Sequence, residues 1–155
     1  AMHDATAFFA DAVAASTALG LRAILLTQDF TQIPAALPPG VVHVPYVPFS
    51  LLLPRARALV HHGGVGTLAQ ALRARLLQLV VPQAYDQFDN ASRLEALGVA
   101  HAIYPREDGS RPPLPDALAQ LLADASVPTA CVAVAERLAC QQPLERVRLA
   151  LESLA

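Results

Sequence analysis

Apolar residues recur along the chain at two spacings, and segments of the two kinds alternate. Residues 6–19 carry them at helical intervals, and Gly20 follows as a natural stop. The next apolar run, residues 21–27, is short and rich in branched aliphatic side chains, which is typical of a buried strand. Ser50 is placed to cap a single helical turn that ends at Pro54.

The alternation continues to the end of the chain. We expect further strands at residues 41–44, 58–61, 79–81 and 99–103, helices at about 67–74 and 88–97, and a helical remainder from Pro115 onward. Short strands that are apolar on both faces and alternate with helices predict an α/β domain, with a Rossmann-like parallel sheet covered by helices on both faces. Ligands of such sheets bind at the carboxyl ends of the strands, so the loops that follow the middle strands carry the most information.

Composition narrows the class of protein. Of the 155 residues, 54% are hydrophobic and 15% charged, which suits one folded domain and argues against disorder. No apolar run approaches the ~18 residues that span a bilayer, so we expect no transmembrane segment. A formal net charge of -2 argues against binding to nucleic acid or to an anionic membrane. A single anion held by backbone amides stays compatible with that charge.

The cysteines and the beginning of the chain suggest where the protein works and how much of it is present. Cys131 and Cys140 would lie on opposite sides of one helix, where they form no disulfide and share no metal. Free thiols and the lack of a recognisable signal peptide favour a cytoplasmic protein. Because the chain enters a helix almost at once after Ala1, we expect residues 1–155 to be a single domain excised from a longer protein.

The strongest local signal is a glycine-rich segment between a predicted strand and a predicted helix. It comprises residues 61–67, His-His-Gly-Gly-Val-Gly-Thr. Glycines let the backbone approach a ligand, and the following helix presents unpaired N–H groups and the positive end of its dipole. These features suit a diphosphate, although by itself the segment is equally consistent with an ordinary turn before a helix. It has neither a Walker lysine nor a full Gly-x-Gly-x-x-Gly, which excludes the kinase-like and dinucleotide-binding interpretations.

Two further segments follow strands and carry polar or aromatic groups. Asp86 and Gln87 come after the strand at 79–81 and could bind adjacent sugar hydroxyls, but taken alone this segment favours a helix N-cap by Asp86 with solvent-facing neighbours. Tyr46 and Val47 lie in a proline-bounded stretch that could stack on a base and read its edge, but taken alone the stretch favours a loop that contributes aromatic residues to the core. Neither segment decides the function by itself.

Taken in order, these segments resemble the donor-binding domain of family-1-type glycosyltransferases, which have the two-domain GT-B fold. The pattern is an aromatic-Val-Pro segment, then His-x-Gly-x-x-Gly/Ser-Thr, then Pro-x-x-x-Asp-Gln-x-x-Asn-Ala and Leu-Gly. In this chain it runs from Pro45 to Gly98, about a third of the length. The resemblance implies the C-terminal half of a GT-B enzyme, similar to bacterial UDP-glucosyl- and rhamnosyltransferases.

The resemblance also implies which residues meet the diphosphate of the donor. His62, directly before the glycines, matches the histidine that contacts the diphosphate. Gly64, Gly66 and Thr67 would supply phosphate contacts at the start of the helix.

The other ends of the donor are assigned in the same way. Tyr46 would lie near the base, with the Val47 backbone on the base edge. Gln70 stands where many relatives have a ribose-binding glutamate. Asp86 and Gln87 match the acidic-Gln pair that holds the transferred sugar.

One stretch departs from the family pattern. Many relatives have Gly-Val-Pro after the phosphate-binding helix, whereas this chain has Arg75-Leu76-Leu77. The glycine normally ends the helix in a left-handed conformation, which costs a non-glycine residue roughly 1 kcal/mol. Either the helix ends differently here, or the domain tolerates that strain.

The reaction that the resemblance implies is direct displacement at the anomeric carbon of a UDP-sugar or dTDP-sugar. The catalytic base and most of the acceptor site belong to the missing N-terminal domain, so the isolated chain should be inactive. We expect no cofactor and no metal, and structural or surface roles for His3, His43 and His101. Alternatives are a nucleotide-sugar epimerase or lipid-linked N-acetylglucosamine transferase of the same architecture, and a non-catalytic binding module.

Overall fold

The computed structural model describes residues 5–140 and 143–153, which form five short strands, seven α-helices and two 3-10 turns. Along the chain the elements are α1 (Thr6–Ala18), β1 (Ala23–Leu26), η1 (Phe30–Gln32), β2 (Val41–Val44), α2 (Phe49–Leu52), η2 (Leu53–Arg55), β3 (Ala58–His61), α3 (Val65–Arg73), β4 (Leu77–Val80), α4 (Gln87–Ala96), β5 (Ala100–Ala102), α5 (Leu114–Ala123), α6 (Ser126–Ala139) and α7 (Pro143–Glu152). The predicted alternation of strands and helices is confirmed.

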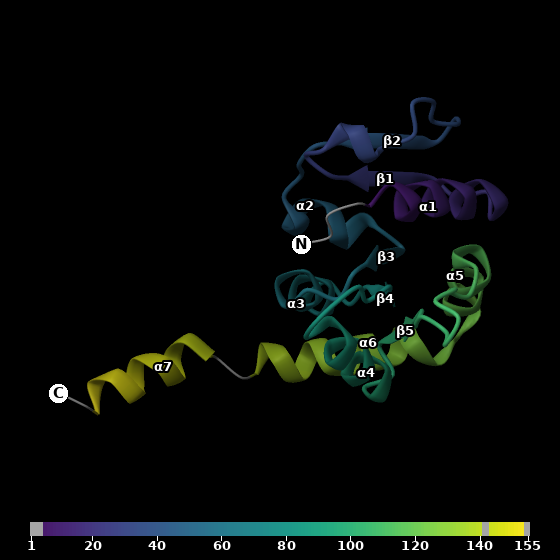
Figure 1. The fold of residues 1–155 in the computed structure, drawn as a ribbon. Helices are drawn as coiled ribbons and strands as arrows, with labels where there is room; N and C mark the ends of the chain where they lie inside the picture. The colour runs from purple at the N-terminus through teal and green to yellow at the C-terminus, as the bar shows by residue number, and fades with distance from the viewer. Residues whose placement is uncertain (1–4, 141–142, 154–155) are drawn as a thin grey trace.

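All strand pairs are parallel, as predicted. β1 pairs with β2, with Ala23 opposite Val41, whereas β3, β4 and β5 form a separate ladder in the order β3-β4-β5. Within the described residues no ladder joins β1 to β3, so the single sheet that the sequence suggested is divided into two hydrogen-bonded sheets. Figure 1 shows the β1–β2 pair above the β3–β5 sheet, with α1 beside the first pair.

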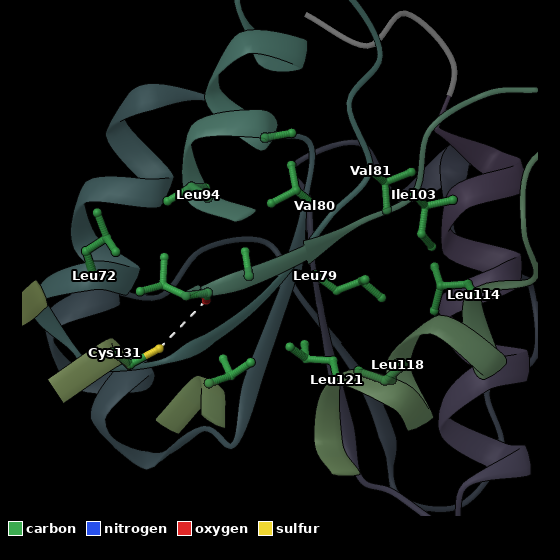
Figure 2. Close-up of a cluster of buried hydrophobic side chains, with 14 of the residues drawn as sticks. Leu72, Leu79, Val80, Val81, Leu94, Ile103, Leu114, Leu118, Leu121 and Cys131 are labelled. Atoms are coloured by element: carbon green, nitrogen blue, oxygen red, sulfur yellow. Dashed lines mark hydrogen bonds between the residues drawn. The ribbon is translucent and has the colours of Figure 1, made fainter. Parts of the chain in front are cut away.

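The main core surrounds β4, the middle strand of the larger sheet. Leu79 and Val80 are fully buried, and α5 packs on one side of the strand while α3 and α6 pack on the other. Figure 2 shows Leu79 pointing toward Leu118 and Leu121 of α5, while Val80 points the other way. Covering on both sides explains why the β4 sequence reads as a nearly continuous apolar run rather than an alternating one.

The local prediction for Ser50 was wrong. The helix begins at Phe49, and Pro48 occupies the N-cap position with no side-chain capping bond. The Pro48 carbonyl accepts hydrogen bonds from the N–H groups of Leu51 and Leu52, at 3.0 and 3.2 Å. The ring of Pro48 fixes its φ at −59°, so the turn starts before Ser50, which lies inside the helix.

The C-terminal part is helical, as expected. Pro115 lies in the first turn of α5 and Pro128 in the first turn of α6. In Figure 1, α7 runs away from the rest of the molecule. No single helix in the described ranges is long and apolar enough to cross a membrane; α5 and α6 meet that test only as a pair bent by 74°.

Candidate functional site

The first turn of α3 presents unpaired backbone donors at the carboxyl end of β3. Gly64 is the N-cap, and its carbonyl accepts the N–H groups of Thr67 and Leu68 at 3.0 and 3.1 Å. Among the described residues, the N–H groups of Val65 and Gly66 donate to no backbone or side-chain acceptor. The helix thus begins two residues earlier than predicted, inside the glycine segment, and offers an anion two donors and a positive dipole end.

Gly63 is the position in this segment that requires glycine. Its φ is +95°, a region that other residues rarely adopt, and a Cβ atom there would lie 3.0 Å from Cγ1 of Val80 and 3.2 Å from the carbonyl oxygen of Gln87. The segment is therefore pressed against both β4 and the start of α4. This close packing fixes where the first turn of α3 can lie.

The two adjacent histidines have different environments. His61, the last residue of β3, is buried, with Nε2 3.1 Å from Oε1 of Gln78 and with Nδ1 accepting the Gly63 N–H at 3.1 Å. Accepting at Nδ1 leaves the ring proton on Nε2, which donates to Gln78. Burial lowers the pKa of His61 to about 4, so this ring is neutral and fully engaged near pH 7.

His62 is half-buried and faces the glycine segment instead. Its Nε2 atom lies beside Gly64, where a Cβ atom would approach it to 2.7 Å. Burial lowers the pKa of His62, and the negative charge of Asp86 acts in the opposite direction. The peptide that follows His62 is joined to Asp86 through Asn90, whose Nδ2 atom donates both to the Gly63 carbonyl and to Oδ2 of Asp86.

Asp86 does not cap α4, although it occupies the N-cap position. Its side chain is exposed, and Oδ2 accepts a hydrogen bond from Nδ2 of Asn90 at 3.0 Å. The neighbouring Gln87 uses its Oε1 atom inside the loop, where it accepts the N–H groups of Gln83 and Ala84 at 2.8 and 3.2 Å. Gln87 thus holds the loop that carries Asp86, and its Nε2 atom is the part left to meet a ligand.

The three residues predicted for the base and ribose line one pocket. This pocket has a volume of about 360 Å³ and is lined by Leu26, Thr27, Gln28, Pro45, Tyr46, Val47, Phe49 and Gln70. Tyr46 is 72% exposed, so it is not a core aromatic residue. Gln70 reaches back along α3, where its Nε2 atom lies 3.3 Å from the Gly66 carbonyl, so the pocket adjoins the first turn of that helix.

Sequence reasoning missed several residues that hold the site together. Gln78, a polar residue within the apolar sequence of β4, is fully buried and bonded to His61. Asn90 appeared only within the family motif, and Arg111 was assigned no role. The Nη2 atom of Arg111 donates to the Pro82 carbonyl at 2.8 Å, behind the loop that carries Asp86. Of these three residues, only Gln78 could have been found from the sequence, because a polar residue in the middle of an apolar strand indicates a buried hydrogen bond.

Two non-glycine residues adopt positive φ. Arg75 has a φ of 57° and ends α3 through the bonds Leu76 N–H to Ala71 carbonyl, 3.0 Å, and Arg75 N–H to Leu72 carbonyl, 3.1 Å. This is a Schellman motif with arginine in the position of glycine, so the domain tolerates the strain. Tyr85, directly before Asp86, has a φ of 55° and is 89% exposed.

The remaining histidines lie apart from these groups. His43 places Nε2 2.8 Å from the Thr27 carbonyl, and His101 pairs with Asp124 at 3.0 Å. Both contacts are structural, as expected. His3 lies outside the described residues.

Comparison with known proteins identifies the family. Residues 20–154 match the family described as erythromycin biosynthesis protein CIII-like, C-terminal domain. The chain belongs to this family. The erythromycin biosynthesis protein CIII-like domain occupies nearly the whole chain, which confirms both the predicted α/β fold and the predicted relationship to family-1-type glycosyltransferases.

Individual relatives agree with the family match. O-mycaminosyltylonolide 6-deoxyallosyltransferase of Streptomyces fradiae is 32% identical over 142 residues, which are 92% of this chain and 33% of the relative. Spinosyn rhamnosyltransferase SpnG has a TM-score of 0.80 and 28% identity, over 96% of this chain and 40% of its own. Glycosyltransferase VinC, solved in complex with dTDP, has a TM-score of 0.74 and 29% identity, over 92% of this chain and 37% of its own.

These relatives define the part of an enzyme to which the chain corresponds. The chain spans between 33% and 40% of the length of the three proteins. Each of them is named as a sugar transferase, which decides against the epimerase alternative. The chain therefore corresponds to the C-terminal domain of glycosyltransferases.

Proposed function

We propose that this chain binds the nucleotide-sugar donor for a longer, two-domain glycosyltransferase that moves a hexose to an acceptor hydroxyl. The observation that carries the proposal is the adjacency of three candidate subsites at the carboxyl ends of the strands. The pocket containing Tyr46 and Gln70 adjoins the first turn of α3 through Gln70, and Asn90 links Gly63, directly after His62, to Asp86. A base, a diphosphate and a sugar would meet these subsites in that order.

The proposed roles follow from the geometry of each group. The N–H groups of Val65 and Gly66 would bind the diphosphate, with the Thr67 hydroxyl alongside. Burial lowers the pKa of His62, and its ring would donate one N–H bond to a phosphate oxygen. These donors are fixed before the reaction, so they would stabilise the charge that develops on the leaving diphosphate.

The remaining residues would set donor specificity. Tyr46 would stack on the base, Val47 would present its backbone to the base edge, and Gln70 would bind the ribose hydroxyls. Asp86 would accept hydroxyl hydrogen bonds from the sugar, and the Nε2 atom of Gln87 would donate to it. The dTDP bound to VinC favours dTDP over UDP as the carrier.

The proposal leaves acceptor activation to the other half of the enzyme. We infer that the catalytic base and most of the acceptor site lie on an N-terminal domain, and that residues 1–155 form a single donor-binding domain. The proposed chemistry requires no metal. Free Cys131 and Cys140 are compatible with a cytoplasmic enzyme.

Calorimetric titration of the chain with dTDP and UDP tests this proposal. Saturable binding that is lost in His62→Ala and kept in Asp86→Ala would support the diphosphate and sugar assignments and would name the carrier. His101→Ala is the matched control, because it removes a histidine that pairs with Asp124 away from the site. The proposal would be refuted if the folded chain bound neither nucleotide by itself and still bound neither when joined to its N-terminal domain.

A further inference from the structure

Asn90 links the candidate diphosphate subsite directly to the candidate sugar subsite. It lies in the first turn of α4, and its Nδ2 atom donates to the Gly63 carbonyl at 2.9 Å and to Oδ2 of Asp86 at 3.0 Å. A carbonyl and a carboxylate both accept hydrogen bonds, so the orientation of the Asn90 amide is determined by its partners. Gly63 belongs to the glycine segment, and Asp86 lies 23 positions later in the sequence, in the loop between β4 and α4.

The Gly63 peptide is held from two sides. Its N–H donates to His61, which in turn donates to the buried Gln78, and its carbonyl accepts from Asn90. A continuous hydrogen-bonded chain therefore runs from Gln78 in the core through His61, Gly63 and Asn90 to the exposed carboxylate of Asp86. Because the Gly63 carbonyl is directed toward α4, its partial negative charge is turned to Asn90 and not to the start of α3.

We propose that Asn90 is a positioning residue that fixes the sugar-binding carboxylate of Asp86 relative to the diphosphate-binding turn. The inference rests on the proposed function. An exposed carboxylate that is already held in one orientation loses less conformational freedom when a sugar hydroxyl donates to it. Without Asn90, Asp86 would have to be ordered by the ligand, and the Gly63 carbonyl would have no side-chain partner.

The role of Asn90 predicts different losses for two ligands. In Asn90→Ala, the affinity for dTDP-glucose should fall about 10-fold, as for the loss of a hydrogen bond to a charged group, with a clearly smaller fall for dTDP. Asn90→Asp keeps the size of the side chain but turns acceptors toward Gly63 and Asp86, so it should bind dTDP-glucose more weakly than Asn90→Ala. Ser92→Ala, an exposed position on the same helix, is the matched control and should change neither affinity.

The measurement is a titration of the wild-type chain and each variant with dTDP, dTDP-glucose, UDP and UDP-glucose, together with the Tm of each protein. Asn90→Ala should add little to the loss of dTDP-glucose affinity already caused by Asp86→Ala. Three results would overturn this inference but leave the proposed function standing. They are unchanged affinities in Asn90→Ala, an equal loss in Asn90→Ala for nucleotide and nucleotide sugar, and an Asn90→Asp variant that binds as well as wild type. Failure of the wild-type chain to bind any of the four ligands would overturn the proposed function, and the inference with it.

Discussion

Arg75 is the position at which a single substitution should stabilise this domain. Its φ of 57° lies in the left-handed region, and its side chain is exposed. Arg75→Gly would remove the Cβ atom that makes this conformation costly, while both hydrogen bonds of the Schellman motif would stay. Leu76, which is buried against Ala71 and Leu53 directly after the turn, would keep its packing.

The expected gain is a difference between two opposing effects. A residue with a Cβ atom loses about 1–2 kcal/mol in the left-handed region, whereas glycine adds about 0.5–1 kcal/mol of backbone entropy to the unfolded chain. The net free energy of unfolding should therefore rise by about 0.5–1 kcal/mol. For a domain of about 150 residues this corresponds to an increase in Tm of about 1–4 °C.

Urea and thermal unfolding of the purified chain, followed by circular dichroism, would measure this effect. The dependence of the unfolding free energy on urea should be unchanged, so that the gain appears as a shift of the midpoint. Arg75→Ala is the first control, because it removes the guanidinium but keeps the Cβ atom and so should show no comparable gain. Arg73→Gly is the second, because it makes the same exchange two positions earlier, in the last helical residue of α3, and should destabilise by about 0.5–1 kcal/mol. If Arg75→Gly were no more stable than Arg75→Ala, backbone strain at Arg75 would not be the reason.

Three further predictions concern the site. The pKa of His61 falls from 6.5 in the unfolded chain to about 4, so stability should be constant above pH 6.5 and fall as the pH decreases toward 4, because only the unfolded state takes up the proton. Between pH 7 and pH 5 the wild-type chain should lose about 2 kcal/mol more unfolding free energy than His61→Asn, and equal losses in urea unfolding would contradict this assignment. Gly64→Ala places a Cβ atom 2.7 Å from Nε2 of His62, so it should weaken nucleotide binding about as much as His62→Ala. The double variant should show no further loss of affinity. Additive losses by calorimetry would show that Gly64 acts independently of His62. Tyr46→Ala should leave Tm within about 2 °C of wild type, since the ring is 72% exposed, but should reduce nucleotide affinity about 10-fold, and undiminished affinity would remove Tyr46 from the base subsite.

The sequence predicted which loops follow the strands and where a helix N-terminus is exposed, because these signals are local. Glycines directly after a strand and before a helix require a tight turn and expose the helix N-terminus, whatever the rest of the chain does. The carboxyl ends of parallel strands meet at one edge, so the order of the elements along the chain is enough to group the loops after β2, β3 and β4. Tyr46, Val47 and Gln70 were assigned to one end of the donor, and the structure places them in one pocket.

What the sequence could not decide depends on contacts between distant segments. His61 and His62 are the same residue type at adjacent positions, and only the packing of β3 against β4 turns His61 toward Gln78 and leaves His62 beside Gly64. The bond from Asn90 to Gly63 spans 27 positions and has no local pattern.

Sequence composition and spacing determined an α/β domain with parallel strands and a glycine turn at the start of a helix, because these follow from short-range sterics and hydrophobic periodicity. Tertiary structure alone decided that the strands form two ladders, that Arg75 takes a strained conformation, and that His61 is buried in the core while His62 is not. Each of these outcomes is a compromise between the local preference of a residue and the packing around it, and that packing exists only when the whole chain is folded.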